Sequence, residues 1–203
     1  SEAAGLATLV GAIKSDGGSA SGFLLNAIEE GSIEGRVAAI EADIGPIEVV
    51  VYNLGAQIGD RALKDTSAKA FETGWRMGTF GLFRLASAVC PLMQARGKGT
   101  ILVTSSTAAM RGNGGQHSHA AAMGGRRMLC QSLNAEFASK GIHVVHIVID
   151  GASTDGTTKI HWLSAWASLG MYGAGQTFSN FMDIDVFPNT IDYWGPSGMT
   201  FLR

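Results

Sequence analysis

One segment organises the rest of the chain: Thr100-Ile-Leu-Val-Thr-Ser-Ser-Thr-Ala-Ala-Met-Arg-Gly-Asn-Gly-Gly-Gln-His-Ser-His-Ala-Ala-Ala-Met123. Its opening residues are apolar or β-branched, which predicts a buried strand over 101–104 that ends at a pair of serines. The glycine-rich run at 112–115 predicts a loop, and the spacing of apolar residues after it predicts a helix over 117–140. Ser106 therefore leaves the carboxyl end of a buried strand, which is where open α/β sheets bind their ligands.

The rest of the chain alternates between strand patterns and helix patterns. Apolar runs predict further strands at 47–52 and 142–149, and residues 20–25 are a candidate for a short strand. The alternation predicts an α/β domain in which the strands at 47–52, 101–104 and 142–149 are parallel and adjacent in that order, with helices on both faces. Apolar residues at helical spacing predict further helices at 3–13, 32–44 and 67–96.

Several motifs resemble those of the short-chain dehydrogenases/reductases. His119 opens a helix thirteen residues after Ser106, and the family has a Tyr and a Ser at this spacing. Met123 stands where the family has the Lys of its Tyr-x-x-x-Lys motif. The resemblance covers residues 1 to about 154 and implies a Rossmann-like, doubly wound parallel sheet in three layers. The other matching segments are Tyr52-Asn-Leu-Gly-Ala56, Gly81-Leu-Phe83 with Pro91, and the strand that ends at Asp150-Gly151.

The resemblance implies a reaction between NAD or NADP and a small-molecule carbonyl or alcohol. In the family the Tyr exchanges a proton with the substrate oxygen, the Ser holds that oxygen, and an Asn on the preceding long helix completes a proton relay. The relay Asn corresponds to Gly78 here, so of these four positions this chain keeps only Ser106. Either Ser106 and His119 form an active pair in which the imidazole is a general acid, or the site is degenerate and His119 is a packing or surface residue.

The resemblance and the strand ends together suggest which residues contact the cofactor. Asn26 aligns with a residue that lies near the adenine in the family, and Asn53 follows the strand at 47–52; either side chain could instead cap a turn. The full set of candidates is Asn26, Asn53, Gly55, Asp150 and Gly151.

The pyrophosphate site of the family has no counterpart in this sequence. That site is a strand followed by a Gly-rich turn and a helix N-terminus. We therefore expect the family's first βαβ unit to be missing and the native protein to extend before Ser1. Without that unit the strand at 47–52 has an unpaired apolar edge, and residues 20–25 have no neighbouring strand.

Composition and charge bear on the kinds of partner. The net charge of −2 gives no electrostatic reason to expect nucleic acid or an anionic membrane. We expect neither a signal peptide nor a membrane span, which would need roughly 18 uninterrupted apolar residues. Cys90 and Cys130 lie in apolar helical contexts, which predicts two buried thiols in a reducing compartment and a cytoplasmic location. The histidine side chains are spaced so that they diverge, and no metal site is predicted.

We expect a single domain over residues 1–203, with a core at 1–154 and a less well matched lid and tail at 155–203. Residues 154–175 mix aromatic and small residues and are interpreted as a helical lid. Arg126 and Arg127 are interpreted as a charged, solvated or interface turn of helix. The two long helices carry more apolar residues than one buried stripe needs, which predicts a homo-oligomer that pairs them.

Two classes of function remain open. The first is a nicotinamide-dependent oxidoreductase of the short-chain dehydrogenase/reductase type whose activity is weak or lost. The second is a non-catalytic protein that retains this fold for dimerisation or partner binding. Fold analogy favours the first class, and the residues at the site favour the second.

Overall fold

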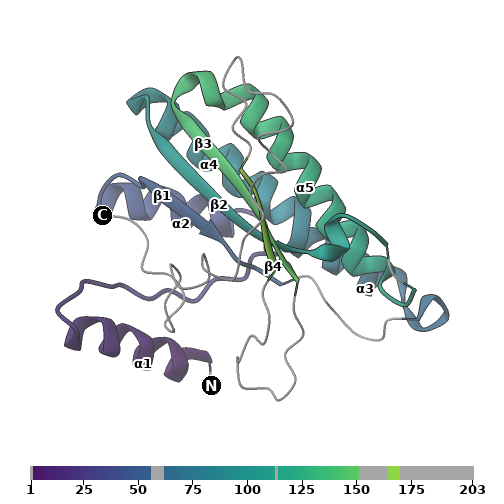
Figure 1. Ribbon diagram of the computed structural model, residues 1–203. Helices are drawn as coiled ribbons and strands as arrows, with labels where there is room; N and C mark the ends of the chain where they lie inside the picture. The colour runs from purple at the N-terminus through teal and green to yellow at the C-terminus, as the bar shows by residue number, and fades with distance from the viewer. Residues whose placement is uncertain (1, 56–61, 113, 151–163, 170–203) are drawn as a thin grey trace.

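The computed structural model describes residues 2–55, 62–112, 114–150 and 164–169, which form one sheet with helices packed on it (Figure 1). The helices are α1 (Glu2–Ser15), α2 (Ser32–Asp43), α3 (Ala68–Trp75), α4 (Gly81–Arg96) and α5 (His117–Phe137). The strands are β1 (Val49–Tyr52), β2 (Gly99–Ser106), β3 (Ile142–Asp150) and β4 (Ser164–Leu169). Short turns complete the description: η1 (Leu63–Asp65), the π-helical η2 (Arg76–Phe80), η3 (Thr107–Ala109) and η4 (Ala138–Lys140).

The sheet has the order β1-β2-β3-β4. The first three strands are parallel, with Tyr52 opposite Val103 and Ser106 opposite Ile149. The predicted α/β class is therefore confirmed, as is the prediction of three parallel strands adjacent in that order. Parallel strands end at the same edge of a sheet, so this register brings the carboxyl ends of β1, β2 and β3 together.

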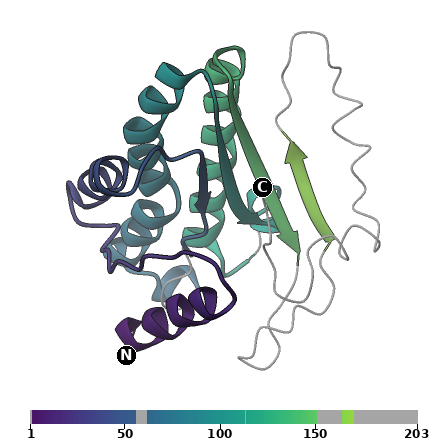
Figure 2. The ribbon, with the colours of Figure 1, turned by 90° about the vertical axis from the view of Figure 1, so that its left-hand side faces the viewer.

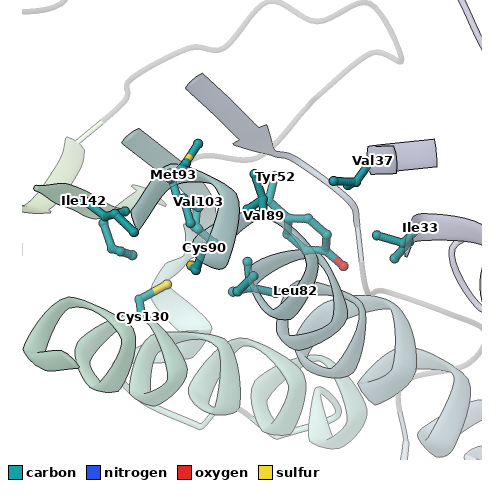
Figure 3. Close-up of a cluster of buried hydrophobic side chains, with 13 residues drawn as sticks. Ile33, Val37, Tyr52, Leu82, Val89, Cys90, Met93, Val103, Cys130 and Ile142 are labelled. Atoms are coloured by element: carbon teal, nitrogen blue, oxygen red, sulfur yellow. The ribbon is translucent and has the colours of Figure 1, made fainter. Parts of the chain in front are cut away.

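The helices α2, α4 and α5 lie on one face of the sheet (Figure 2). In the part of the chain that the structure describes, a second helical layer on the opposite face is not seen. The core forms where these helices meet the strands, and Figure 3 shows its side chains pointing toward one another between the two layers. Its fully buried members include Leu82, Val89, Cys90 and Met93 of α4, Cys130 of α5, and Ile101, Val103, Ile142 and Val144 of the strands.

Both cysteines are free and buried, as predicted. Burial raises the pKa of the Cys90 thiol to about 11 and that of the Cys130 thiol to about 12. Both thiols therefore stay protonated at neutral pH and act as small apolar core residues.

Two predicted elements differ from the structure. Residues 20–25 form no strand, and Phe23, Leu24 and Leu25 are exposed, because none of the strands that the structure describes lies beside them to complete their backbone hydrogen bonds. The interpretation of 154–175 as a helical lid is wrong at 164–169, which form β4 and pair antiparallel with β3. The backbone groups along that edge of β3 find their partners there. The rest of the predicted lid and the tail lie outside the described residues.

His146 is a buried polar residue in the middle of β3. Its side chain lies on the same face of the strand as those of Ile142 and Val144, the face that α5 covers. Burial, together with the positive charges of Arg127 and Arg126, lowers the pKa of His146 to about 4. The imidazole is therefore neutral in the folded protein at physiological pH.

This burial predicts that the protein loses stability in mild acid. Between pH 6.5 and about 4 the unfolded chain binds a proton at His146 that the folded chain does not, so the free energy of unfolding falls as pH falls through this window. Urea denaturation at a series of pH values checks it. The variant His146→Leu should show a flatter pH dependence than the native chain over the same window, and identical slopes would contradict the prediction.

Candidate active site

Ser106 and His119 meet at the carboxyl end of β2. Ser106 is the last residue of this strand, and His119 lies in the first turn of α5. The distance between Ser106 Oγ and His119 Nε2 is 3.0 Å, which is hydrogen-bond distance. Which of the two atoms donates depends on the imidazole tautomer. The spacing in the sequence thus brings together the two residues proposed as a catalytic pair.

Met123 fills the position that the resemblance gives to Lys. It is 3% exposed, and its Sδ lies 3.5 Å from the hydroxyl oxygen of the buried Ser105. A thioether carries no charge and is only a weak acceptor, so it can neither bind a ribose hydroxyl strongly nor tune the proton affinity of a neighbour. The site therefore lacks its expected cation at this position.

The long helix predicted at 67–96 is interrupted by the π-helical turn η2 beside the site. A π turn leaves backbone carbonyls outside the regular helical pattern, and such turns are frequent at functional sites. The Met77 carbonyl accepts a hydrogen bond from the Tyr52 hydroxyl, and the Gly78 carbonyl accepts one from Arg126 Nε at 2.8 Å. Because Gly78 has no side chain, this carbonyl is what the chain offers at the position of the relay Asn.

The helix α5 packs very closely on this turn. Thr79 Oγ1 donates to the Ala122 carbonyl at 2.7 Å, and a Cβ at Gly125 would lie only 2.7 Å from the same hydroxyl oxygen. Glycine at position 125 therefore allows the contact that aligns α5 with η2.

Arg126 is a residue of the site that the sequence interpretation missed. The prediction of a solvated or interface position is wrong, because Arg126 is 2% exposed. Its guanidinium donates to the Leu54 carbonyl at 2.7 Å and to the Thr104 carbonyl at 2.6 Å, in addition to Gly78. Position 126 lies two helical turns after His119 on the same face of α5, and this spacing is the signal that could have placed it inward.

Tyr52 does not replace the missing catalytic Tyr. Its ring is buried, and Arg126 Cζ lies over it at 5.0 Å from the ring centre. Its hydroxyl donates a hydrogen bond to the Met77 carbonyl of η2. Burial raises the pKa of Tyr52 to about 12 despite the nearby positive charges of Arg126 and Arg84. The side chain therefore has a structural role in joining β1 to the π turn.

The candidate cofactor residues are divided between two places. Asn53 follows β1, and its Oδ1 accepts from Thr104 Oγ1 at 2.5 Å, so it lies beside the end of β2. Asn26 Oδ1 accepts from the Ile28 backbone nitrogen at 3.2 Å, which is a turn-capping role. Gly55 has open space around it, Asp150 ends β3, and Gly151 lies outside the described residues.

A groove of about 980 Å³ runs along β1 and reaches Asn53. Among the described residues β1 pairs only with β2, so the groove follows the apolar strand edge that the sequence predicts to be unpaired. Its walls include Ile33 and Val37 of α2 and Val50 of β1.

The described residues fit one end of a nicotinamide dinucleotide better than the other. Asn53, Ser106 and His119 offer polar groups suited to the ribose and the nicotinamide. The helix beside the groove, α2, follows Glu29-Glu30, whose carboxylates repel a pyrophosphate, while the Glu34 carboxylate in its first turn is paired with Arg84. The pyrophosphate thus finds no favourable helix N-terminus in α2.

Other site types find little support in the structure. In residues 2–55, 62–112, 114–150 and 164–169, no three His, Cys, Asp or Glu side chains gather in a way that could hold a metal ion. No helix in the described parts of the chain combines the length and apolar character needed to cross a bilayer.

Comparison with known proteins identifies the family. Residues 1–162 match the family model described as short chain dehydrogenase. The chain is 30% identical over 170 residues to the 3-oxoacyl-acyl-carrier-protein reductase of Escherichia coli (strain K12), covering 81% of this chain and 69% of the relative. It is 32% identical over 124 residues to nodulation protein G of Azospirillum brasilense, covering 61% of this chain and 50% of the relative.

Solved structures agree with this result. A short-chain dehydrogenase from Rhodopseudomonas palustris matches with a TM-score of 0.67 at 33% identity, over 70% of this chain and 66% of its own. A gluconate 5-dehydrogenase from Burkholderia cenocepacia J2315, in complex with NADP and tartrate, matches with a TM-score of 0.68 at 26% identity, over 72% of this chain and 57% of its own. The architecture is thus that of a Rossmann-like α/β protein. The chain belongs to the short-chain dehydrogenase family, and it spans between half and about 70% of the length of these relatives.

The described residues suit only one end of a dinucleotide, which predicts weak cofactor binding. Because we find no favourable site for the pyrophosphate among the described residues, the chain should bind NAD(H) and NADP(H) with affinities weaker than micromolar. Titration calorimetry with each of the four nucleotides measures this, and micromolar affinity for any of them would contradict the prediction.

Proposed function

We propose that this chain is a nicotinamide-dependent oxidoreductase that acts on a small-molecule carbonyl or alcohol, with low activity. The observation that carries the proposal is the 3.0 Å contact between Ser106 Oγ and His119 Nε2 at the carboxyl ends of the strands. Family membership supports it, as do relatives named as a 3-oxoacyl reductase and a gluconate dehydrogenase. The two buried thiols fit a reducing, cytoplasmic location.

The proposed chemistry divides between the two side chains. A bound NAD or NADP would supply or accept the hydride. In the reducing direction the Ser106 hydroxyl donates a hydrogen bond to the carbonyl oxygen of the substrate and holds it near His119. His119 then gives that oxygen a proton through Nε2, and in the oxidising direction it takes the proton back.

Two features of the site explain why we propose low activity. His119 lies in the first turn of α5, where the helix dipole opposes the positive charge of an imidazolium. Met123 is buried where a Lys is expected, so no ammonium group lies at that position to bind a ribose hydroxyl or assist proton transfer.

The second proposal is a non-catalytic protein that uses this fold for dimerisation or partner binding. The observations that favour it are the buried thioether of Met123, the missing side chain at Gly78, and the acidic surroundings of the α2 N-terminus. This proposal predicts a folded protein that turns over no carbonyl above background, so that substitutions at Ser106 and His119 leave the measured rate unchanged.

The two proposals give different results for substitutions at the pair. If the chain is an oxidoreductase, Ser106→Ala and His119→Phe should each lower kcat/KM for carbonyl reduction by roughly 10²-fold, because each removes a group that acts on the reacting oxygen. The matched control is His117→Phe, two residues earlier on the same helix and exposed, which should leave the rate unchanged. Equal loss in the control, or no loss at His119, would contradict the assigned roles.

We also propose that the protein is a homo-oligomer that pairs α3, α4 and α5 with their copies. Trp75, Phe80 and Phe83 form a stacked aromatic row along α3, η2 and α4, with ring centres 5.4 and 6.0 Å apart. Phe83 is 50% exposed, and Met128 of α5 is 51% exposed. Helices that present apolar residues on an outer face need a second layer to cover them.

This arrangement predicts a dimer that dissociates when a charged side chain is introduced into the interface. Light scattering across a dilution series should give at least twice the chain mass for the native protein at micromolar concentration. The variants Phe83→Glu and Met128→Glu should give the monomer mass, because each buries a carboxylate in the interface. A native monomer at these concentrations would contradict the proposal.

A further inference from the structure

Arg126 is a buried cation whose hydrogen bonds within the described residues all go to backbone carbonyls. Three carbonyls from three different elements, those of Leu54, Gly78 and Thr104, accept from its guanidinium at 2.6–2.8 Å. The salt bridges found in the described parts of the chain do not include it. A buried charge is costly, so a chain that keeps one with carbonyl partners gains something specific from it.

The location of Arg126 suggests what that gain is. Met123 and Arg126 are three residues apart on α5, so they share one face of the helix. Their side-chain ends contact consecutive residues of β2: Met123 reaches Ser105, and Arg126 reaches Thr104. Arg126 also binds the carbonyl of Gly78, which stands at the position of the relay Asn.

We propose that Arg126 is the positioning cation of the candidate site. It takes the place of the lysine that the family has at position 123, where this chain has Met. The inference rests on the proposed function. The Arg126 guanidinium binds the carbonyl of Leu54, which follows Asn53, and that of Thr104, two residues before Ser106. It also binds the π turn that packs on α5. It thereby fixes the three segments that must converge for Ser106, His119 and Asn53 to face one substrate.

The proposal has a consequence that a purely structural role does not share. A cation at position 123 would be buried about one helical turn from the buried guanidinium of Arg126, where like charges repel. They are therefore alternatives: a Lys at 123 should be tolerated only when Arg126 is removed, and it should then restore what Arg126 supplied.

A double-mutant cycle in urea tests this exchange without any need for catalysis. The variants are Arg126→Leu, Met123→Lys and the combination of both. Each single change should lower the unfolding midpoint, and the combination should be more stable than either single variant. The matched control replaces Met123→Lys by Ser132→Lys, at an exposed position of the same helix, and should restore nothing to Arg126→Leu.

The result remains decisive if the single variant fails to fold. Folding of the combined variant would then support the exchange, and failure of both would overturn it. Additive destabilisation, or equal recovery by the Ser132→Lys control, would also overturn it. The conservative variant Arg126→Lys should keep the native midpoint more closely than Arg126→Leu.

The positioning role of Arg126 is measured at His119, one of the side chains that it is proposed to align. The ¹⁵N NMR signals of the His119 ring should shift in Arg126→Leu and return in the combined variant, while those of His117 stay unchanged. If the chain turns over a carbonyl, kcat should fall about 10²-fold in Arg126→Leu with a smaller change in KM, and recover in the combination. Unshifted His119 signals in Arg126→Leu would overturn the positioning role. A chain without turnover that still shows the stability exchange would refute the proposed function alone.

Discussion

Three backbone carbonyls, from the ends of β1 and β2 and from the π turn, converge on one buried guanidinium. A hydrogen bond to a charged group contributes about 1.5–3 kcal/mol, so three of them offset the several kcal/mol needed to desolvate the cation. Leaving the carbonyls without a donor would instead cost about 1–3 kcal/mol each. The contact between α5 and η2 and the placement of Ser106 beside His119 both depend on this arrangement.

The parts of the fold that follow from local pattern could be predicted from the sequence. The apolar runs at 47–52, 101–104 and 142–149 predict the parallel strands. From the sequence, Ser106 and His119 are either an active pair or part of a degenerate site; the structure places Ser106 Oγ and His119 Nε2 3.0 Å apart. The inward position of Arg126 could not be predicted in this way, because two adjacent arginines on a helix resemble a solvated turn. Its partners are carbonyls released by a π turn and by two strand ends, and these exist only in the tertiary structure.

The other differences between the predicted and the observed elements also depend on whether a neighbouring strand is present to pair with. Residues 20–25 have a strand-like sequence but pair with none of the four described strands, so their backbone remains irregular and Phe23 stays exposed. Residues 164–169 have no strong local strand signal, yet they form β4 because the edge of β3 offers a ladder of hydrogen-bonding groups. Family membership explains the architecture, while the exchanges at 78, 119 and 123, together with the buried Arg126, bear on what the site can do.

The central claim is that Ser106 and His119 support hydride transfer to a carbonyl. Mass spectrometry of product alcohols tests it most directly, after incubation of the native chain with small ketones and 3-oxoacyl thioesters and a millimolar excess of NADH and NADPH deuterated at the transferred position. This method detects turnover even when it is slow and cofactor binding is weak. The account predicts deuterium at the carbinol carbon with the native chain and at least about tenfold less with Ser106→Ala. Equal incorporation by both proteins, or none above a protein-free control, would contradict it.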